Sequence, residues 1–256
     1  MRTILQKPWL QRTAAVLFWL AVWQAAAMVI GQEVFLVSPV QALETLLGLL
    51  PQGAFWQRIG YSSGRILLGF GLGAVCSVAL AVAAHRWKGI ELLLAPVMQV
   101  VKAMPVASFI ILALVWLSSR QLSFFISFLM VFPPIYLAVL TGLGQADRAL
   151  LEMAKVYRVP FFRQVRFLYL PAVAPHLRSA VSLGLGLCWK AGIAAEVIGL
   201  PDGSVGERLY MAKVHFETPE LFAWTAVIVT VSAVLEKLFL RLLDGALRKA
   251  GALRAR

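Results

Sequence analysis

The stretch ALLEMAKVYRVPFFRQVRFLYLP, residues 149–171, is a polar, basic loop that lies between long apolar segments. Its first nine residues favour a helix, and Pro160 is expected to end or bend that helix, because proline has no amide donor. A second, basic helix is predicted over Arg163–Tyr169, and we expect it to stop at Pro171. The pattern therefore predicts two short helices at one surface of an otherwise apolar molecule.

The composition of the chain excludes an ordinary soluble domain. Of its 256 residues, 61% are hydrophobic and 14% are charged, whereas a soluble domain carries about 25% charged residues. The surplus apolar surface requires a non-aqueous solvent, so the sequence predicts an all-α protein embedded in a lipid bilayer. The net charge of +12 does not indicate a nucleic-acid partner, because the basic residues lie in loops beside the apolar segments. Cys76 and Cys188 lie within apolar stretches and are interpreted as buried thiols, not as a disulfide or a metal site.

Six apolar segments are predicted to be transmembrane helices. They are approximately Ala14–Gly31, Ile66–Ala84, Leu92–Leu117, Leu122–Gly144, Leu177–Leu200 and Leu221–Leu240. The first is expected to be a retained span and not a signal peptide, because its apolar run exceeds a typical signal core. Between the first two, Ser38-Pro39 followed by Val40, Leu43, Leu46 and Leu47 predicts a capped amphipathic helix at the outer interface.

The basic residues predict the direction of these spans. On the side that holds both termini lie sixteen of them: Arg2, Lys7, Arg12, Arg86, Lys88, Arg148, Lys155, Arg158, Arg163, Arg166, Arg178, Arg241, Arg248, Lys249, Arg254 and Arg256. On the opposite side lie five: Arg58, Arg65, Arg120, Arg208 and Lys213. Because cytoplasmic loops carry the excess of Lys and Arg, both termini and the 149–171 loop are predicted to be cytoplasmic.

The two loop helices have the composition of a protein docking site. Its apolar centre would consist of Leu151, Ala154, Tyr157, Phe161 and Phe162, and its charged rim of Glu152, Lys155, Arg158 and Arg163. An apolar centre inside a polar rim is the usual anatomy of a protein interface. The alternative is a membrane-surface helix whose Lys and Arg residues bind lipid phosphates.

The spacing of this loop resembles the cytoplasmic loop of bacterial ATP-binding-cassette import permeases, E-A-A-x3-G-x9-I-x-L-P. The matches are Glu152, Ala154, Leu170 and Pro171; Met153 replaces the middle Ala, Arg158 the Gly and Leu168 the Ile. Because glycine at this place would permit a sharp turn, the bend is expected to depend more on Pro160. The stretches WKAG (189–192), AEVIG (195–199) and GERL (206–209) are similar to the nitrate/sulfonate/taurine branch, and the resemblance covers residues 55–245.

The resemblance implies a type I ABC importer permease fold in the bacterial inner membrane. Residues 1–54 would form an N-terminal tail, the first span and the outer interfacial helix; 55–245 would form the permease domain with a coupling loop over 145–176, and 246–256 a basic tail. The protein would move a small anionic or polar solute, such as nitrate, a sulfonate or taurine, into the cytoplasm. Its partners would be a second permease copy, in a homodimer, two cytoplasmic ATPase subunits and an extracytoplasmic solute-binding protein.

The same resemblance assigns the docking role to residues of the loop. They are Leu151, Glu152, Met153, Ala154, Tyr157, Arg158, Phe161, Phe162, Leu170 and Pro171. The chain lacks the G-x-x-x-x-G-K-[ST] phosphate-binding loop, so we expect no cofactor and no catalytic residue in it. ATP and Mg²⁺ would be bound by the partner ATPase.

Lys102, Lys190, Glu196 and Glu236 fall within or near the edges of predicted spans, where a charge costs about 3 kcal/mol on insertion scales. Glu236 lies near the inner end of the last span, where snorkelling is a sufficient explanation. Lys102, Lys190 and Glu196 could line the translocation path, and a lysine there would favour an anion. Alternatively, Lys102 could bond backbone carbonyls freed by a helix bend at Pro105. Lys190 and Glu196 are six residues apart and are not neighbours on one helix face, so they could instead pair across helices or across a dimer.

Glycines at four-residue spacing, Gly60/Gly64 and Gly69/Gly73, would let the second span approach another helix closely. Packing within the chain is the simpler interpretation, and a path or subunit interface is the alternative.

Two other classes of protein fit this sequence less well. A self-contained ion-coupled carrier would need inverted repeats and mid-span carboxylates, and no convincing repeat is found. An intramembrane enzyme would need buried Ser/His or paired Asp groups, whereas His85, His176 and His215 lie in loops or at span ends.

Overall fold

A computed structural model describes the backbone of residues 8–251, and the side chains of these residues except 8–10 and 12. Throughout this range every regular element is helical, which confirms the all-α prediction. The elements are α1 (Pro8–Ile30), α2 (Pro39–Leu49), α3 (Gly53–Arg86), α4 (Lys88–Ala103), α5 (Val106–Ala113), α6 (Ser119–Gly144), α7 (Arg148–Val156), α8 (Phe161–Gln164), the π turn η1 (Val165–Tyr169), α9 (Leu170–Gly199), α10 (Val205–Val214) and α11 (Thr218–Lys249).

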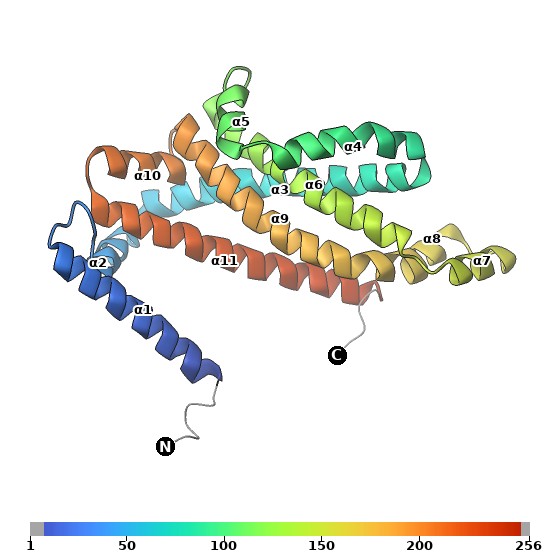
Figure 1. Ribbon diagram of the computed structural model, residues 1–256, viewed down its shortest axis with the longest axis horizontal. Helices are drawn as coiled ribbons and strands as arrows, with labels where there is room; N and C mark the ends of the chain where they lie inside the picture. Colours follow the sequence, from blue (N-terminus) through green and yellow to red (C-terminus); the bar gives the residue numbers. More distant parts are fainter. Residues whose placement is uncertain (1–7, 252–256) are drawn as a thin grey trace.

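Four long helices, α3, α6, α9 and α11, run along the length of the molecule (Figure 1). The central one is α6, which packs most extensively against α3 and α9, while α11 lies against α9 and α2. At one end α7 and α8 protrude beyond the long helices, and at the other end lies α10 (Figure 1). We call these the α7 end and the α10 end.

Four helical runs are long and apolar enough to cross a membrane, and they lie in α1, α3, α6 and the run 161–199 that includes α9. A fifth crossing would be made by α4 and α5 together, which are bent by 106° at their junction. This break falls at Met104-Pro105, so the bend predicted at Pro105 is confirmed. The sixth predicted span, Leu221–Leu240, lies within the 32-residue α11, and the count of six remains a prediction.

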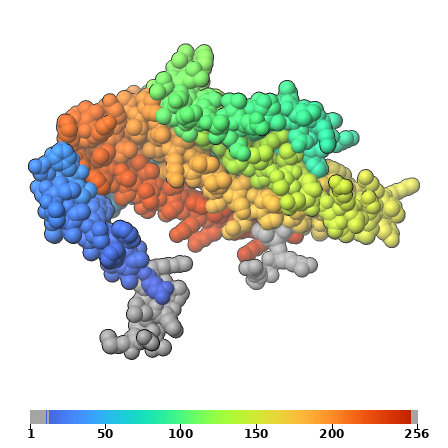
Figure 2. Space-filling model, viewed as in Figure 1, coloured from blue at the N-terminus to red at the C-terminus, as the bar shows by residue number. Residues whose placement is uncertain are grey.

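The first helix stands apart from the bundle (Figure 2). Near its end, the Trp23 indole donates a hydrogen bond to the Val37 carbonyl at 2.9 Å, and the Trp23 ring lies 5.5 Å from that of Phe222. Within its most apolar stretch, 6% of the residues are buried. The exposed apolar side chains of α1 are therefore in keeping with a lipid surrounding.

The capped helix predicted after Ser38 is confirmed as α2. Ser38 Oγ accepts a hydrogen bond from the Gln41 amide, and the Gln41 side chain accepts one from the Ser38 amide, at 3.3 and 3.2 Å. This reciprocal capping box satisfies amides that have no partner inside the helix.

Glycine allows the close contact between α3 and α6. A Cβ atom on Gly69 would lie 2.3 Å from the Phe124 carbonyl oxygen, and one on Gly73 would lie 2.3 Å from Val131 Cγ1. Packing within the chain is therefore confirmed for this pair, because no side chain fits there. Gly60 and Gly64 are exposed, with open space where a Cβ would stand, so they make no such contact.

The prediction that the second loop helix stops at Pro171 is wrong, because the helix continues past this residue. Residues Phe161 to Gly199 form an unbroken helical run, in which Pro171 occupies the first turn of α9. Just before it, the amide of Leu170 donates to the carbonyl of Val165, five residues back. This wider π turn accommodates a proline that lacks a donor and would crowd the ordinary helical ladder.

The last helix continues past residue 246, where the basic tail is predicted to begin, to Lys249. Its Leu247 is 5% exposed and packs with Ala174 of α9. The C-terminal part of α11 is thus held against the start of α9, and residues 246–249 belong to the bundle.

Basic residues gather at the α7 end. Arg86 and Lys88 lie at the α3–α4 junction, and the 148–166 segment and the last turn of α11 lie at the same end (Figure 1). Arg2, Lys7, Arg254 and Arg256, which entered the orientation count, lie outside the described residues. The cytoplasmic position of both termini therefore remains a prediction.

Candidate functional site

The exposed face of α7 differs from the predicted one. The helix begins at Asp147, whose Oδ1 accepts a hydrogen bond from the Ala149 amide at 2.9 Å. Its exposed apolar side chains are Leu150, Met153, Val156 and Tyr157, of which Val156 and Tyr157 are 78% and 75% exposed. Leu150 and Ala154, four residues apart, lie close together around the helix, so the boundary between the exposed and buried sides of α7 runs between them.

Two predicted docking residues therefore need correction. Ala154 is 2% exposed and Leu151 is half-buried, so both face their own chain and position α7. Both faces of α7 carry apolar residues, which is why their periodicity did not distinguish the outward face. Sequence reasoning missed Val156 and Leu150, whose exposure depends on packing against the rest of the chain.

Phe161 and Phe162 complete the exposed surface. They open α8 directly after Pro160, are 67% and 85% exposed, and their ring centroids are 6.2 Å apart. We call Met153, Val156, Tyr157, Phe161 and Phe162 the inner knob. Exposed aromatic and aliphatic groups gathered in this way mark an interaction surface more often than isolated ones do.

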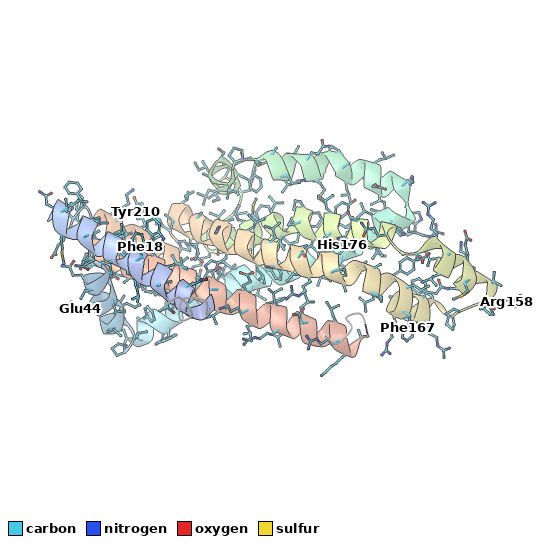
Figure 3. The ribbon with its side chains drawn as sticks, turned by 60° about the horizontal axis from the view of Figure 1, so that its bottom comes forward. Phe18, Glu44, Arg158, Phe167, His176 and Tyr210 are labelled. Carbon is cyan, nitrogen blue, oxygen red and sulfur yellow. The ribbon has the colours of Figure 1, made fainter. Side chains whose placement is uncertain are left out.

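The predicted charged rim consists of four residues from α7, α8 and the turn between them. Glu152, Lys155, Arg158 and Arg163 are all exposed, and none takes part in the three ion pairs found among residues 8–251. Arg158 lies at the extreme tip of the α7 end (Figure 3). These charges are therefore available to a partner.

The sharp turn of the loop lies at Arg158 itself, and not mainly at Pro160 as expected. Arg158 has a φ of 50°, a left-handed conformation. Its amide donates to the Lys155 carbonyl at 3.1 Å, and the Val159 amide donates to the Ala154 carbonyl at 2.8 Å. This pair of bonds is a Schellman cap, which glycine usually supplies. Here an arginine adopts the turn in spite of its Cβ.

Replacing Arg158 by glycine is expected to stabilise the loop by roughly 1 kcal/mol. A non-glycine residue in this conformation is strained by about 1–2 kcal/mol, and the greater freedom of glycine in the unfolded chain removes part of the gain. The measurement is the rate of limited proteolysis between residues 155 and 163 in purified protein. Lys155→Gly, inside α7, should accelerate cleavage, and equal acceleration by R158G would contradict the strained turn.

The last two predicted docking residues lie behind the knob. Leu170 packs with Ala174 of α9 and with Leu243 and Leu247 of α11, and both Leu170 and Pro171 are half-buried. They therefore anchor the start of α9 and are not exposed contacts.

A second candidate surface is a groove between α4, α6 and α9. Its volume is about 450 Å³, and it is lined by Lys102, Pro133, Leu137, His176, Leu183 and Leu187, among others. His176 lies in the middle part of the α9 run (Figure 3) and is hydrogen-bonded to Gln145 Oε1 at 2.8 Å. Sequence reasoning missed His176 in this groove, because its partners come from α4 and α6.

Lys190 continues the exposed face of α9 that begins in the groove. It follows Leu183 by seven residues and Leu187 by three, which places the three side chains on one face. Lys102 and Lys190 are both exposed, and neither joins an ion pair within the described part of the chain. In residues 88–113 no backbone carbonyl accepts a hydrogen bond from Lys102, so the carbonyl-bonding alternative gains no support.

Glu196 is separated from these two lysines. Its side chain is 0% exposed and is enclosed by α3, α9 and α10. A carboxylate with no open surface does not touch a solute in this conformation, so the grouping of Glu196 with Lys102 and Lys190 is not supported.

A family model matches residues 69–249, and it describes the binding-protein-dependent transport system inner membrane component. The match therefore covers α6, the inner knob, α9, α10 and all of α11.

Three relatives align with most of the chain. Two carry the name "Putative aliphatic sulfonates transport permease protein SsuC": that of Escherichia coli K12 is 30% identical, over 92% of this chain and 94% of the relative, and that of Bacillus subtilis 168 is 28% identical, over 90% and 83%. The taurine transport system permease protein TauC of Escherichia coli K12 is 26% identical, over 84% and 80%. All three are permease proteins of transport systems.

Proposed function

The chain belongs to the family of binding-protein-dependent transport system inner membrane components, and on this premise we propose how its two exposed surfaces divide the work of an ABC importer. It is a multi-pass inner-membrane permease subunit and not itself an enzyme. We propose that the inner knob receives a cytoplasmic ATPase and that the groove face forms one half of the solute path.

The observation that carries this proposal is the exposure of Phe161 and Phe162 at the start of an unbroken helical run to Gly199. A partner that grips the knob would act directly on α9, because the run between them is helical throughout. ATP and Mg²⁺ would be bound by the ATPase, whose closure would move the knob. The bundle would then alternate between outward-open and inward-open states as its populations shift.

The groove supports the solute path. A lysine that lies inside a membrane span and has no ionic partner normally faces water or protein. Lys102 and Lys190 lie on the open α4–α6–α9 side. We propose that a second copy of this chain closes that side, as a homodimer, with two ATPase subunits below and a solute-binding protein at the α10 end. The sulfonate and taurine relatives make a small solute with an anionic group the proposed cargo.

The experiment that tests the proposal is purification of the tagged wild-type chain from its own membranes, with identification of the proteins that accompany it. Recovery of an ATPase subunit and a solute-binding protein is the expected result. If neither accompanies intact wild-type protein, the importer proposal fails and a self-contained carrier takes its place.

Replacing Lys102 or Lys190 by methionine is expected to slow uptake of radiolabelled taurine roughly tenfold, because one charge-assisted hydrogen bond contributes about 1.5–3 kcal/mol. The matched control is Lys237→Met, since Lys237 is also an exposed lysine in a long helix but belongs to α11, outside the groove. The measurement is uptake rate in cells, normalised to the amount of membrane-inserted protein. Unchanged uptake in both groove variants would contradict an anion path along this face.

A further inference from the structure

Glu196 joins three helices at the α10 end. Its Oε2 accepts a hydrogen bond from Ser62 Oγ of α3 at 2.6 Å and from the Gly206 amide of α10 at 3.3 Å. Ser62 Oγ in turn accepts a hydrogen bond from the Val205 amide at 3.0 Å. Thus one carboxylate from α9 and one hydroxyl from α3 bond the first two amides of α10.

These contacts supply the cap of α10. The first amides of a helix have no acceptor within it, and here the amides of Val205 and Gly206 are bonded by side chains of other helices. The third, of Glu207, donates to Ser204 Oγ at 3.0 Å. A carboxylate at a helix N-terminus is favoured by the helix dipole, which accounts for a buried acidic group at this place.

The backbones of α9 and α10 also touch there. A Cβ atom on Gly206 would lie 2.4 Å from Glu196 Cβ and 2.7 Å from the Val197 amide nitrogen. The start of α10 is therefore seated on the last turns of α9, with no room for a side chain between them.

Two ion pairs hold α10 elsewhere. Arg58 of α3 lies 2.9 Å from Glu207, and Arg208 lies 2.7 Å from Glu220 of α11. All four side chains keep some exposure to solvent, so both pairs are partly screened by water and salt. The buried Glu196 contact is the tie between α10 and α9 itself.

We infer that Glu196 is a positioning residue that fixes α10 to the end of α9, so that the two move as one body. Its consequence for transport rests on the proposed function: α9 would carry the inner knob near one end and α10 at the other. Docking of a partner at the α10 end would then be linked to the ATPase through one helical rod.

The test compares amide hydrogen exchange in the purified full-length chain, in lipid nanodiscs, for wild type, Glu196→Gln, Glu196→Leu and Ser62→Ala. The Leu variant fills the site but has no acceptor, and exchange over residues 204–208 is expected to rise at least tenfold. The Gln variant keeps an acceptor oxygen and should remain within about threefold of wild type. Ser62→Ala should accelerate exchange at the Val205 amide and leaves the inference testable if the Leu variant does not fold.

Exchange over residues 131–143 of α6 is the internal control, because none of these residues is hydrogen-bonded to Glu196 or Ser62. Unchanged exchange over 204–208 in both Glu196→Leu and Ser62→Ala would overturn the inference. So would equal acceleration by the Gln and Leu variants, because the carboxylate's acceptor role would then be irrelevant. These outcomes need no ATPase, so they separate failure of the inference from failure of the proposed function.

A functional readout adds the link to transport. In the complex purified with its partners, Glu196→Leu is expected to keep basal ATP hydrolysis. The stimulation of that hydrolysis by the solute-binding protein should fall at least tenfold. Glu196→Gln should retain the stimulation. Full stimulation in a Leu variant whose α10 exchanges rapidly would overturn the proposed link between α10 and the ATPase.

Discussion

Replacing Phe161 and Phe162 together by serine is expected to abolish recovery of the ATPase subunit with this permease. The two rings are 67% and 85% exposed and are the two phenylalanines of the inner knob. Truncating an aromatic residue at the centre of an interface commonly weakens binding by about 2 kcal/mol or more. The pair would then weaken binding by about 4 kcal/mol, more than a hundredfold. The measurement is the amount of ATPase retained on the tagged chain in detergent.

The matched control is Phe35→Ser. Phe35 is 73% exposed but lies between α1 and α2, away from the α7 end (Figure 1), so ATPase recovery should be unchanged. Ala154→Asp is a poor substitute for the double variant, because Ala154 is buried and a carboxylate there would disturb α7 itself. Wild-type recovery of the ATPase by F161S/F162S would place the docking site elsewhere on the chain.

The 149–171 loop illustrates which features follow from local composition and which depend on contacts with the rest of the chain. The apolar runs and their basic flanks predicted the membrane class and most helices, because transfer of a long helix into lipid depends on local composition. The outward face of α7 depended on which side packs against the chain, and Leu151 and Tyr157 are both acceptable on either side. The left-handed turn at Arg158 was unexpected because its hydrogen bonds, and not residue preference, hold it.

Contacts between distant residues account for the other gaps. Ser62 and Glu196 are 134 residues apart, and α10 was not among the predicted elements because the partners of its first amides come from two other helices. The placement of Glu196 with the lysines followed from its charge and its span, yet its burial is set by Ser62 and Gly206. A mid-span glycine pattern did predict close packing, but it did not say which pair makes it.

Gly69→Leu is expected to be among the most damaging single substitutions in the membrane region. A Cβ atom there would lie 2.3 Å from the carbonyl oxygen of Phe124 and 3.0 Å from Ser127 Cβ. The first of these is backbone and cannot rotate away, so α3 would have to withdraw from α6, with which it shares one of the largest contacts in the fold. Overpacking of a core costs about 1–3 kcal/mol or more, which corresponds to a fall in Tm of roughly 10 °C at this chain length.

Gly71→Leu tests the same change two residues away on the same helix. No atom lies within 4 Å of the Cβ position of Gly71, and leucine favours a helix by about 1 kcal/mol over glycine. We therefore expect G71L to keep or raise the Tm in nanodiscs while G69L lowers it and reduces the folded yield. If both variants lost stability equally, the damage would come from added bulk along α3 in general, through lipid or a second copy. Opposite signs would establish the α3–α6 backbone contact as its cause.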